Sequence, residues 1–221
     1  MTKLSSPVEL IKKSVNIFSN KENFIYFVKI YALLLPFSIF SLFQSLMLNS
    51  DALPKNVLFT VIIVAVNILN FLVYILVSVA GIDAVRRVIE KDKLSFKSTI
   101  VFAWKKYKLF FLLTILLGLV VGLGFVLLII PGLLFMVWFS LSRFIVVESK
   151  VGIKEAFVKS KELVKGRFWP VLGRLIVFGL FSSIVGFVVA VVPYGIGAAL
   201  GVFLEALFLL PSYLLYKELL D

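Results

Sequence analysis

Long apolar runs make up most of the chain, and short polar stretches separate them. A helix that crosses a hydrocarbon core of about 30 Å needs roughly 20 apolar residues. Five runs reach about that length, namely Phe24–Leu48, Val57–Ile82, Leu109–Ile130, Pro170–Val192 and Gly195–Tyr216. The pattern therefore predicts an all-α, polytopic transmembrane bundle.

A sixth run, Leu133–Val147, is short enough to leave two interpretations. It follows Pro131-Gly132 and, at 1.5 Å per residue, would reach only about 22 Å. It is either a short span whose Arg143 side chain extends to the interface, or part of a re-entrant hairpin over residues 109–147. We favour six spans, and both alternatives return the chain to the same side.

A short amphipathic segment precedes the first, third and fifth spans. The first begins with the capping sequence Ser6-Pro7-Val8-Glu9, and the others are Ser95–Lys108 and Ile153–Lys165. Apolar residues recur at helical spacing in each, which is typical of helices that lie in the membrane interface.

The first and third segments also resemble each other in sequence. Residues 9–14 (ELIKKS) match residues 155–160 (EAFVKS), whereas the middle segment fits only loosely. We interpret the chain as a single membrane domain of three units, each an interfacial helix plus a helical hairpin, at about 1–83, 84–147 and 148–221. The alternative is that amphipathic helices before spans simply resemble one another.

Composition supports the membrane assignment and excludes much chemistry. Hydrophobic residues make up 62% of the 221 residues and charged residues 16%, and the mean hydropathy is +1.11. A soluble domain of this size could not bury so much apolar surface, so the excess must face lipid. The chain has neither His nor Cys, the commonest metal ligands and nucleophile–base components. We therefore expect no catalytic residue, metal or cofactor.

The basic residues predict the orientation. The net charge is +11, and Lys and Arg gather before the first span and in the connections Arg86–Lys108 and Arg143–Arg167. The opposite face carries only Asp51 and Lys55, and its other loop, at Pro193-Tyr194, is uncharged. By the positive-inside rule, both termini and both long connections are cytoplasmic, in the inner or plasma membrane. The first span is expected to remain as an anchor, since no cleavage site follows it.

Anionic membrane lipid is the expected partner of the basic segments. Nucleic acid is not, because the basic residues share helices with apolar faces. The candidate lipid-contact residues are Lys105, Lys106, Lys108, Lys159, Lys161, Lys165, Arg167, Trp104 and Trp169. The alternative is that orientation alone accounts for this charge. The sequence leaves open whether the chain forms a homo-oligomer or binds a partner membrane protein.

Polar residues inside the predicted spans are the remaining candidates for chemistry. They are Glu205, Asn67, Asn70, Arg143 and Arg174. A carboxylate inside a membrane is costly and suggests function. Glu205 is either protonated and hydrogen-bonded to a neighbouring helix or exposed to a polar cavity with the two asparagines. Both arginines lie near the inner ends of their spans, so direct pairing with Glu205 would need a bent geometry.

Two further patterns have structural interpretations. Small residues pair at helix-packing spacing, at Gly118/Gly122, Gly179/Ser183 and Gly197/Gly201. The carboxylates Asp83, Glu90 and Asp92 cluster near the end of the second span, where neighbouring basic residues favour a solvated charged turn over an enzyme site.

The stretch from Leu127 to Val171 resembles a known membrane domain. It contains Pro131-Gly132, Trp138, Phe139 and Glu148, then Ala156, Ser160, Leu163, Gly166 and Trp169 at helical spacing. This order is similar to the membrane domain attached to some bacterial glycerophosphoryl diester phosphodiesterases and to related six-span proteins. The resemblance implies a membrane module only, because the phosphodiesterase chemistry belongs to a separate barrel domain with paired His residues, which this chain lacks.

Two functions follow from these observations. The first is a non-catalytic membrane protein that organises or contacts anionic lipid, or a membrane assembly, through basic amphipathic helices. The alternative is a transporter or channel for a small solute or lipid that uses Glu205. A polar cavity that reaches Glu205 would favour transport, whereas a tightly packed interior would favour the first function.

Overall fold

The chain folds into helices, as the apolar pattern predicts. The computed structural model describes residues 4–48, 57–192, 197 and 201–221, and no strand occurs among them. Within these ranges five helices are long and apolar enough to cross a membrane: Lys21–Gln44, Val57–Glu90, Phe96–Leu127, Ile129–Glu148 and Phe168–Ala190. The prediction of a multi-pass, all-α membrane protein is confirmed.

The described chain consists of α-helices and short 3₁₀ turns. The first are α1 (Pro7–Ser19), α2 (Lys21–Tyr31), the 3₁₀ turn η1 (Ala32–Leu34), α3 (Leu35–Leu48) and α4 (Val57–Glu90). They continue as α5 (Phe96–Leu127), α6 (Ile129–Trp138), α7 (Ser142–Glu148), α8 (Ile153–Val164), α9 (Phe168–Ala190), the 3₁₀ turn η3 (Val202–Leu204) and α11 (Glu205–Leu220). The predicted loops at 51–55 and 193–194, and the start of the last span, lie outside the described residues.

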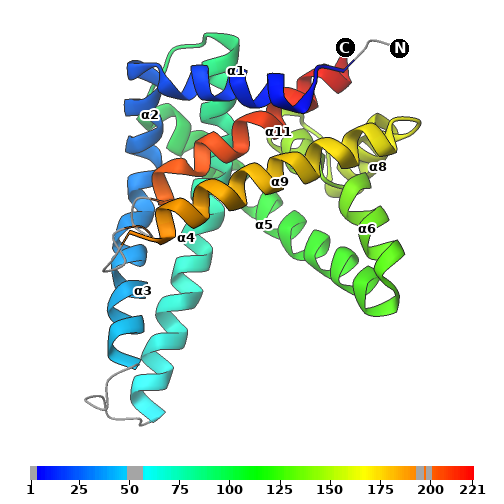
Figure 1. Cartoon of the computed structure of the whole chain (residues 1–221). Helices are drawn as coiled ribbons and strands as arrows, with labels where there is room; N and C mark the ends of the chain where they lie inside the picture. The colour runs from blue at the N-terminus through cyan, green and yellow to red at the C-terminus, as the bar shows by residue number, and fades with distance from the viewer. Residues whose placement is uncertain (1–3, 49–56, 193–196, 198–200) are drawn as a thin grey trace.

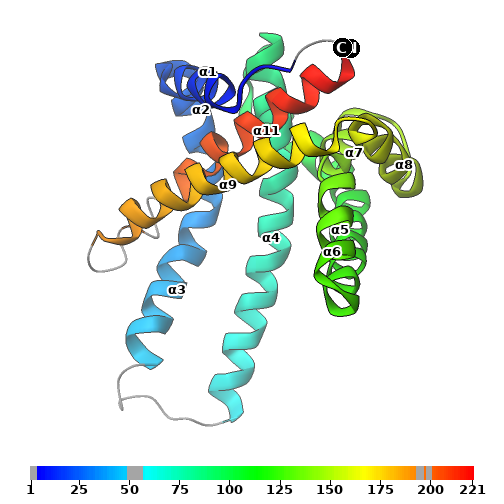
Figure 2. The ribbon, with the colours of Figure 1, turned by 45° about the vertical axis from the view of Figure 1, so that its right-hand side comes forward.

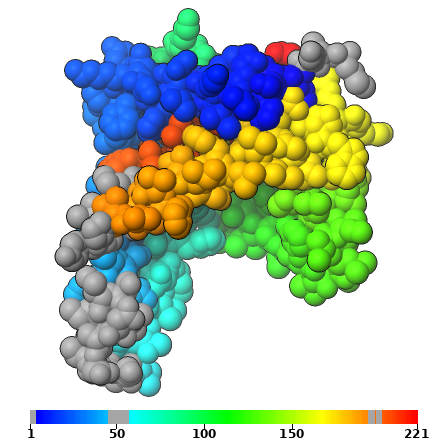
Figure 3. Space-filling model, viewed as in Figure 1, coloured from blue at the N-terminus to red at the C-terminus, as the bar shows by residue number. Residues whose placement is uncertain are grey.

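Two pairs of helices point away from a common end of the molecule and diverge from each other. Figure 1 shows α3 with α4 and α5 with α6 pointing away from the end where α1 and the C-terminus lie, while α9 and α11 cross beside them. The turned view in Figure 2 shows the α3–α4 and α5–α6 hairpins well separated away from that end. The space-filling view is accordingly hollowed below α9, between α4 and the α5–α6 hairpin (Figure 3).

The tightly packed core lies where the hairpins meet at the common end. It contains the last turns of α4, most of α7 and most of α11, with fully buried side chains at Ala80, Ala84, Phe144, Val146 and Tyr213. Away from it, large apolar side chains face outward: Val126 is 83% exposed, Ile129 75% and Phe187 72%. Apolar surface on this scale requires lipid rather than water as its solvent.

Two predicted element boundaries differ from the structure. The segment Ser95–Lys108 is not a separate interfacial helix but the start of α5, an unbroken helix that lacks any Gly or Pro before Gly118. The break after α5 falls at Leu128, in extended conformation, rather than at Pro131-Gly132. Pro131 instead lies in the first turn of α6, where its missing N–H leaves no helical bond unmade.

The prediction of close helix packing at the small-residue pairs is wrong for most of them. A Cβ atom built on Gly118, Gly122, Gly179 or Gly201 would meet no atom of the described residues within 4 Å, so no described helix approaches there. Among the described glycines of these pairs, Gly197 does lie against a neighbouring backbone, that of Val189 in α9. Spacing alone could not distinguish a glycine that faces a helix from one that faces outward.

Asp83 is buried rather than part of a solvated turn. Its carboxylate is 0% exposed and accepts hydrogen bonds from Arg86 Nη2 at 2.7 Å, Arg87 Nε at 2.6 Å and Thr99 Oγ1 at 2.9 Å. Tyr26 extends the cluster from α2, with its hydroxyl 2.6 Å from Thr99 Oγ1. The cluster joins α2, α4 and α5, and its charge pairing explains how a carboxylate is kept inside the bundle.

Candidate intramembrane cavity

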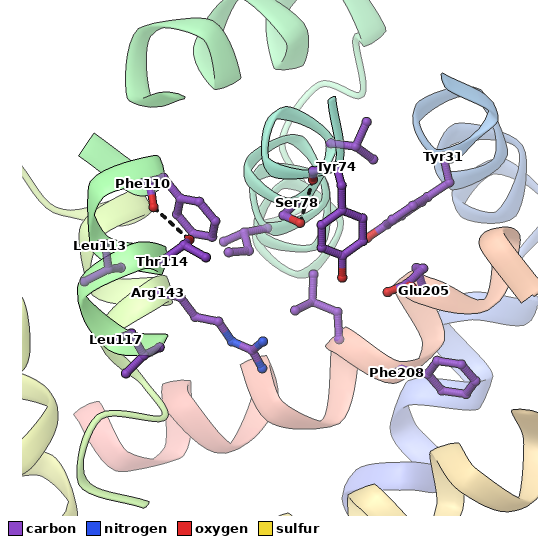
Figure 4. Close-up of a pocket in the computed structure, with 13 residues that line it drawn as sticks. Tyr31, Tyr74, Ser78, Phe110, Leu113, Thr114, Leu117, Arg143, Glu205 and Phe208 are labelled. Atoms are coloured by element: carbon purple, nitrogen blue, oxygen red, sulfur yellow. Dashed lines mark hydrogen bonds between the residues drawn. The ribbon is translucent and has the colours of Figure 1, made fainter. Parts of the chain in front are cut away.

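A cavity of about 370 Å³ lies between α2, α4, α5, α7 and α11. Its polar lining consists of Tyr31, Tyr74, Ser78, Thr114, Arg143 and Glu205, and the remaining wall is apolar. Figure 4 shows Arg143 and Glu205 pointing into the space from opposite sides, with the Tyr74 hydroxyl between them. Two of the three charged candidates that the sequence placed inside the spans, Arg143 and Glu205, therefore share one cavity.

Arg143 reaches the cavity from the first turn of α7 without a polar partner. Its Nε atom is buried and makes no hydrogen bond within the described chain. No ion pair joins Arg143 to Glu205, although both belong to the described residues, and the guanidinium lies 5.0 Å from the centre of the Phe144 ring. A guanidinium has five N–H donors and stays charged, so this side chain is left with unused capacity for an anionic or polar ligand.

The corner between α6 and α8 holds Arg143 in place. Ser160 in α8 is fully buried; its Oγ donates to the Trp138 carbonyl at 2.7 Å and accepts from the Leu141 N–H at 3.2 Å. These bonds fix the turn between α6 and α7, directly before Arg143. Lys161 adds a contact from α8, with Nζ 4.4 Å from the centre of the Trp138 ring. Ser160 is thus a positioning residue for Arg143.

Two 3₁₀ turns lie beside the cavity wall that faces Arg143. Tyr31 immediately precedes η1, and Glu205 immediately follows η3. Pro36 explains the first turn, because it has no N–H to bond the Ala32 carbonyl and the helix tightens there. Tyr31 then passes close against Gly81 of α4, where any Cβ would collide with its hydroxyl. Gly81 is therefore needed for the ring to reach the cavity.

An ionic cluster crosses from α4 to α7 and α11 at the common end. Lys217 Nζ binds Glu90 Oε1 at 2.8 Å and Glu148 Oε2 at 3.2 Å, and Glu148 also accepts a hydrogen bond from Tyr213. Partial burial opposes the charge of Lys217, but the bonds and charges of the two carboxylates outweigh it and raise its pKa above the ordinary value. Arg86 joins this cluster to Asp83, since it contacts both Asp83 and Glu90. The cluster fastens the hairpins together at the common end.

A second, mainly apolar crevice adjoins the cavity at Arg143. It has a volume of about 570 Å³ and lies between α5, α6 and α9. The cavity and the crevice share Thr114, Leu117 and Arg143, so the guanidinium stands where the two spaces meet. The rest of the crevice wall is almost entirely apolar, and includes Gly118, Met136 and Ile176.

The other intramembrane candidates do not belong to this site. Arg174 donates its Nε and Nη2 hydrogens to the Ser5 carbonyl, at 3.0 Å and 2.6 Å, and so ties α9 to the start of α1. Asn67 is exposed and donates to the Ile63 carbonyl of its own helix at 2.8 Å. Asn70 is also absent from the cavity lining. Glu205, for its part, faces the cavity, and among the described residues its carboxylate makes no hydrogen bond to a neighbouring helix.

Most lipid-contact candidates lie on exposed surface. Trp104 is 67% exposed and Trp169 76%, and the side chains of Lys105, Lys108, Lys159, Lys161 and Lys165 are also exposed. Arg167 is half-buried. Lys106 differs, because its Nζ donates to the carbonyls of Val146 at 2.9 Å and Ser149 at 2.6 Å at the end of α7. Lys106 thus has a structural role that the sequence did not suggest.

Sequence reasoning missed four polar residues of the cavity: Tyr31, Tyr74, Ser78 and Thr114. All four stand singly within apolar runs, and single hydroxyls are common in membrane helices. Two of these hydroxyls bond to their own helix, Ser78 to the Tyr74 carbonyl and Thr114 to the Phe110 carbonyl, each at 2.8 Å (Figure 4). The usable signal was a tyrosine inside a span, away from the interface where tyrosines usually lie.

No group of three or more His, Cys, Asp or Glu side chains placed to hold a metal occurs in the described part of the chain. Comparison of the whole chain with models of protein families, with curated proteins and with solved structures gave no match.

Proposed function

We propose that this chain is a membrane carrier that binds a small solute or lipid in the cavity and moves it through the bundle. The observation that supports the proposal most strongly is that Arg143 and Glu205 both face one polar cavity but do not contact each other. Two charges inside an apolar bundle are costly, and a bound ligand offers the interactions that they do not make with each other.

Binding and transfer fit the cavity better than catalysis. Its polar groups are hydroxyls, one carboxylate and one guanidinium, and the chain has no His or Cys to serve as base or nucleophile. We therefore propose a non-catalytic protein that needs no cofactor or metal.

We further propose six spans in three repeated units. In this arrangement α11 is the last span, and the broken helix Ile129–Glu148 is the fourth. Support comes from how each unit packs on another: α1 packs on α11, the start of α5 on the end of α4, and α8 on α6 and α7. The three units also share a property at the position eight residues after the helix caps Ser6, Ser95 and Gly152. The residues there are Ser14, Ala103 and Ser160, which are small and fully buried.

Contact with anionic lipid is a second candidate role. The proposal places the common end at the cytoplasmic face of the cell membrane, with α1, α8 and the start of α5 against the headgroups. The exposure of Trp104 and Trp169 favours this, because indoles settle at headgroup depth. If the protein shows no preference for anionic over zwitterionic liposomes, this role is wrong.

Membership of the phosphodiesterase-associated membrane domains remains a proposal. It is supported by the role of the motif-like residues in one corner: Ser160 bonds the Trp138 carbonyl, Ala156 is fully buried, and Gly166 has a φ of 78° that favours glycine. Such a corner would be a structural unit of a membrane module rather than an active site.

A flux assay tests the carrier proposal. Vesicles containing the purified protein are loaded with glycerol 3-phosphate or prepared with a tail-labelled fluorescent phospholipid, and we expect one of the two probes to cross faster than in protein-free vesicles. Glu205→Gln and Arg143→Gln should abolish the added flux, whereas the outward-facing Asn67→Ala should retain it. Wild-type protein that moves neither probe would refute the carrier function.

A further inference from the structure

We propose that the cavity and the crevice together bind a phospholipid, with its phosphate at Arg143, its headgroup donors at Glu205 and an acyl chain in the crevice. The inference rests on the proposed carrier function, for which it names the substrate class. It follows from the position of one charged side chain at the junction of a polar and an apolar space.

The phosphate is placed by the chemistry of Arg143. The guanidinium is planar, permanently charged and free of hydrogen bonds and ion pairs within the described chain, and its Nε is buried. Such a group binds a phosphate or carboxylate through two parallel N–H bonds. A neutral solute would leave the buried charge uncompensated.

Glu205 adds a requirement for the rest of the headgroup. It faces Arg143 from the opposite wall, next to the Tyr31 and Tyr74 side chains (Figure 4). A carboxylate that accepts hydrogen bonds suits a headgroup with N–H or O–H donors, such as an ethanolamine or a glycerol. A choline headgroup has no such donor and should bind less well.

The crevice supplies a path for an acyl chain. Beyond Thr114, Ser140 and Arg143 its wall is apolar, and Ile176 on its wall is 52% exposed. A lipid can therefore insert an acyl chain from the surrounding membrane into the crevice without passing through water. A soluble phosphate compound has no apolar chain to fill the crevice. This apolar extension commits the site to a lipid rather than to a free phosphate compound.

Competitive lipid binding tests the inference. Purified full-length protein is offered equal amounts of phosphatidylethanolamine, phosphatidylglycerol and phosphatidylcholine with identical chains, and native mass spectrometry counts what it retains. We expect the first two to exceed phosphatidylcholine by about tenfold, the ratio that one charge-assisted hydrogen bond supplies. Glu205→Gln should remove this preference, and Arg143→Gln should reduce the retention of all three lipids.

Filling the crevice by mutation tests the inference without changing the charged residues. The side chain introduced by Gly118→Leu projects into the crevice. The variant should fold, because a Cβ at this position meets no described atom within 4 Å, and it should retain less lipid. Gly179→Leu is the matched control, since that glycine is equally open on α9 but does not line the crevice. Equal retention of all three lipids, unchanged retention in Gly118→Leu, or equally tight binding of free glycerol 3-phosphate would overturn the inference. Selective binding without flux would instead refute the carrier function alone.

Discussion

At the scale of single residues, the chain keeps its charges inside an apolar bundle in two different ways. Asp83 is fully buried but compensated by two guanidinium groups and a hydroxyl. Arg143 is placed at a cavity and has no such partner. The first arrangement stabilises the fold, and the second leaves a charge available for a ligand. The two sites therefore predict mutational effects of opposite sign.

Replacing Asp83 should destabilise the protein strongly. Asp83→Asn leaves Arg86 and Arg87 without their buried counter-charge, a change that costs about 3–5 kcal/mol. Thermal unfolding of the detergent-solubilised protein measures it. Glu9→Gln is the control, because Glu9 pairs with Lys13 on exposed surface, where such pairs contribute about 0–1 kcal/mol. Equal melting temperatures for the two variants would contradict this account of Asp83.

Replacing Arg143 should stabilise the lipid-free protein. Arg143→Leu removes a buried donor that lacks a partner, and leaving such a donor unsatisfied costs about 1–3 kcal/mol. We therefore expect a higher melting temperature after exhaustive delipidation, together with loss of ligand binding. A lower melting temperature would mean that Arg143 is a structural residue.

Contacts between particular residues were the feature that the sequence predicted least well. Glu148 and Tyr213 are 65 positions apart, and Arg174 and Ser5 are 169 apart, yet both pairs are hydrogen-bonded. Hydropathy locates each helix but carries no information about which faces meet. Arg143 and Glu205 were identified individually as polar residues inside spans, and their meeting in one cavity depends on helix breaks at η3 and before α7 that the pattern did not indicate.

At the scale of elements, the α5–α6 hairpin depends on two glycines that the spacing argument overlooked. A Cβ on Gly124 would lie 2.8 Å from the Phe135 ring and 2.9 Å from the Gly132 Cα. On Gly132 it would lie 2.5 Å from the Phe125 ring. The two helices therefore approach closely at Gly124 and Gly132, not at the predicted pair Gly118/Gly122.

Enlarging Gly124 should open this hairpin. Gly124→Leu forces the backbones apart and should cost about 1–3 kcal/mol or more, as overpacking does. Gly122→Leu, two residues earlier on the open face of the same helix, should leave stability nearly unchanged because nothing lies within 4 Å of its Cβ. The comparison uses thermal unfolding of both variants, and equal losses would show that the hairpin does not pack as described.

Element lengths, by contrast, were largely predictable, because the membrane sets them. The apolar runs locate most ends of the described spans to within several residues. The two larger discrepancies are the start of α5, which begins at Phe96 instead of the predicted Leu109, and the end of α4. This helix continues to Glu90, eight residues beyond the predicted Ile82. At about 51 Å it is much longer than a 30 Å hydrocarbon core, so its charged last turns can be paired at the common end instead of in lipid.

At the scale of the whole molecule, the proposed orientation can be tested with single cysteines, since the native chain has none. Lys93→Cys and Lys154→Cys lie on exposed positions next to the common end and should react only with thiol reagents supplied from the cytoplasmic side. Lys55→Cys, at a position outside the described residues, is predicted from charge alone to react from the opposite side. Labelling of all three from one side would overturn the topology.

The carrier function requires a cavity with polar lining inside the bundle instead of a packed interior, and single cysteines at two adjacent positions reveal whether that cavity exists. Ser78 lines the cavity on α4, whereas Val79 is 0% exposed in the core. We expect that Ser78→Cys reacts with a small methanethiosulfonate reagent, that added phosphatidylglycerol slows the reaction, and that Val79→Cys stays unreactive. If Ser78→Cys is as inert as Val79→Cys in the folded protein, the cavity does not exist and the carrier function fails with it.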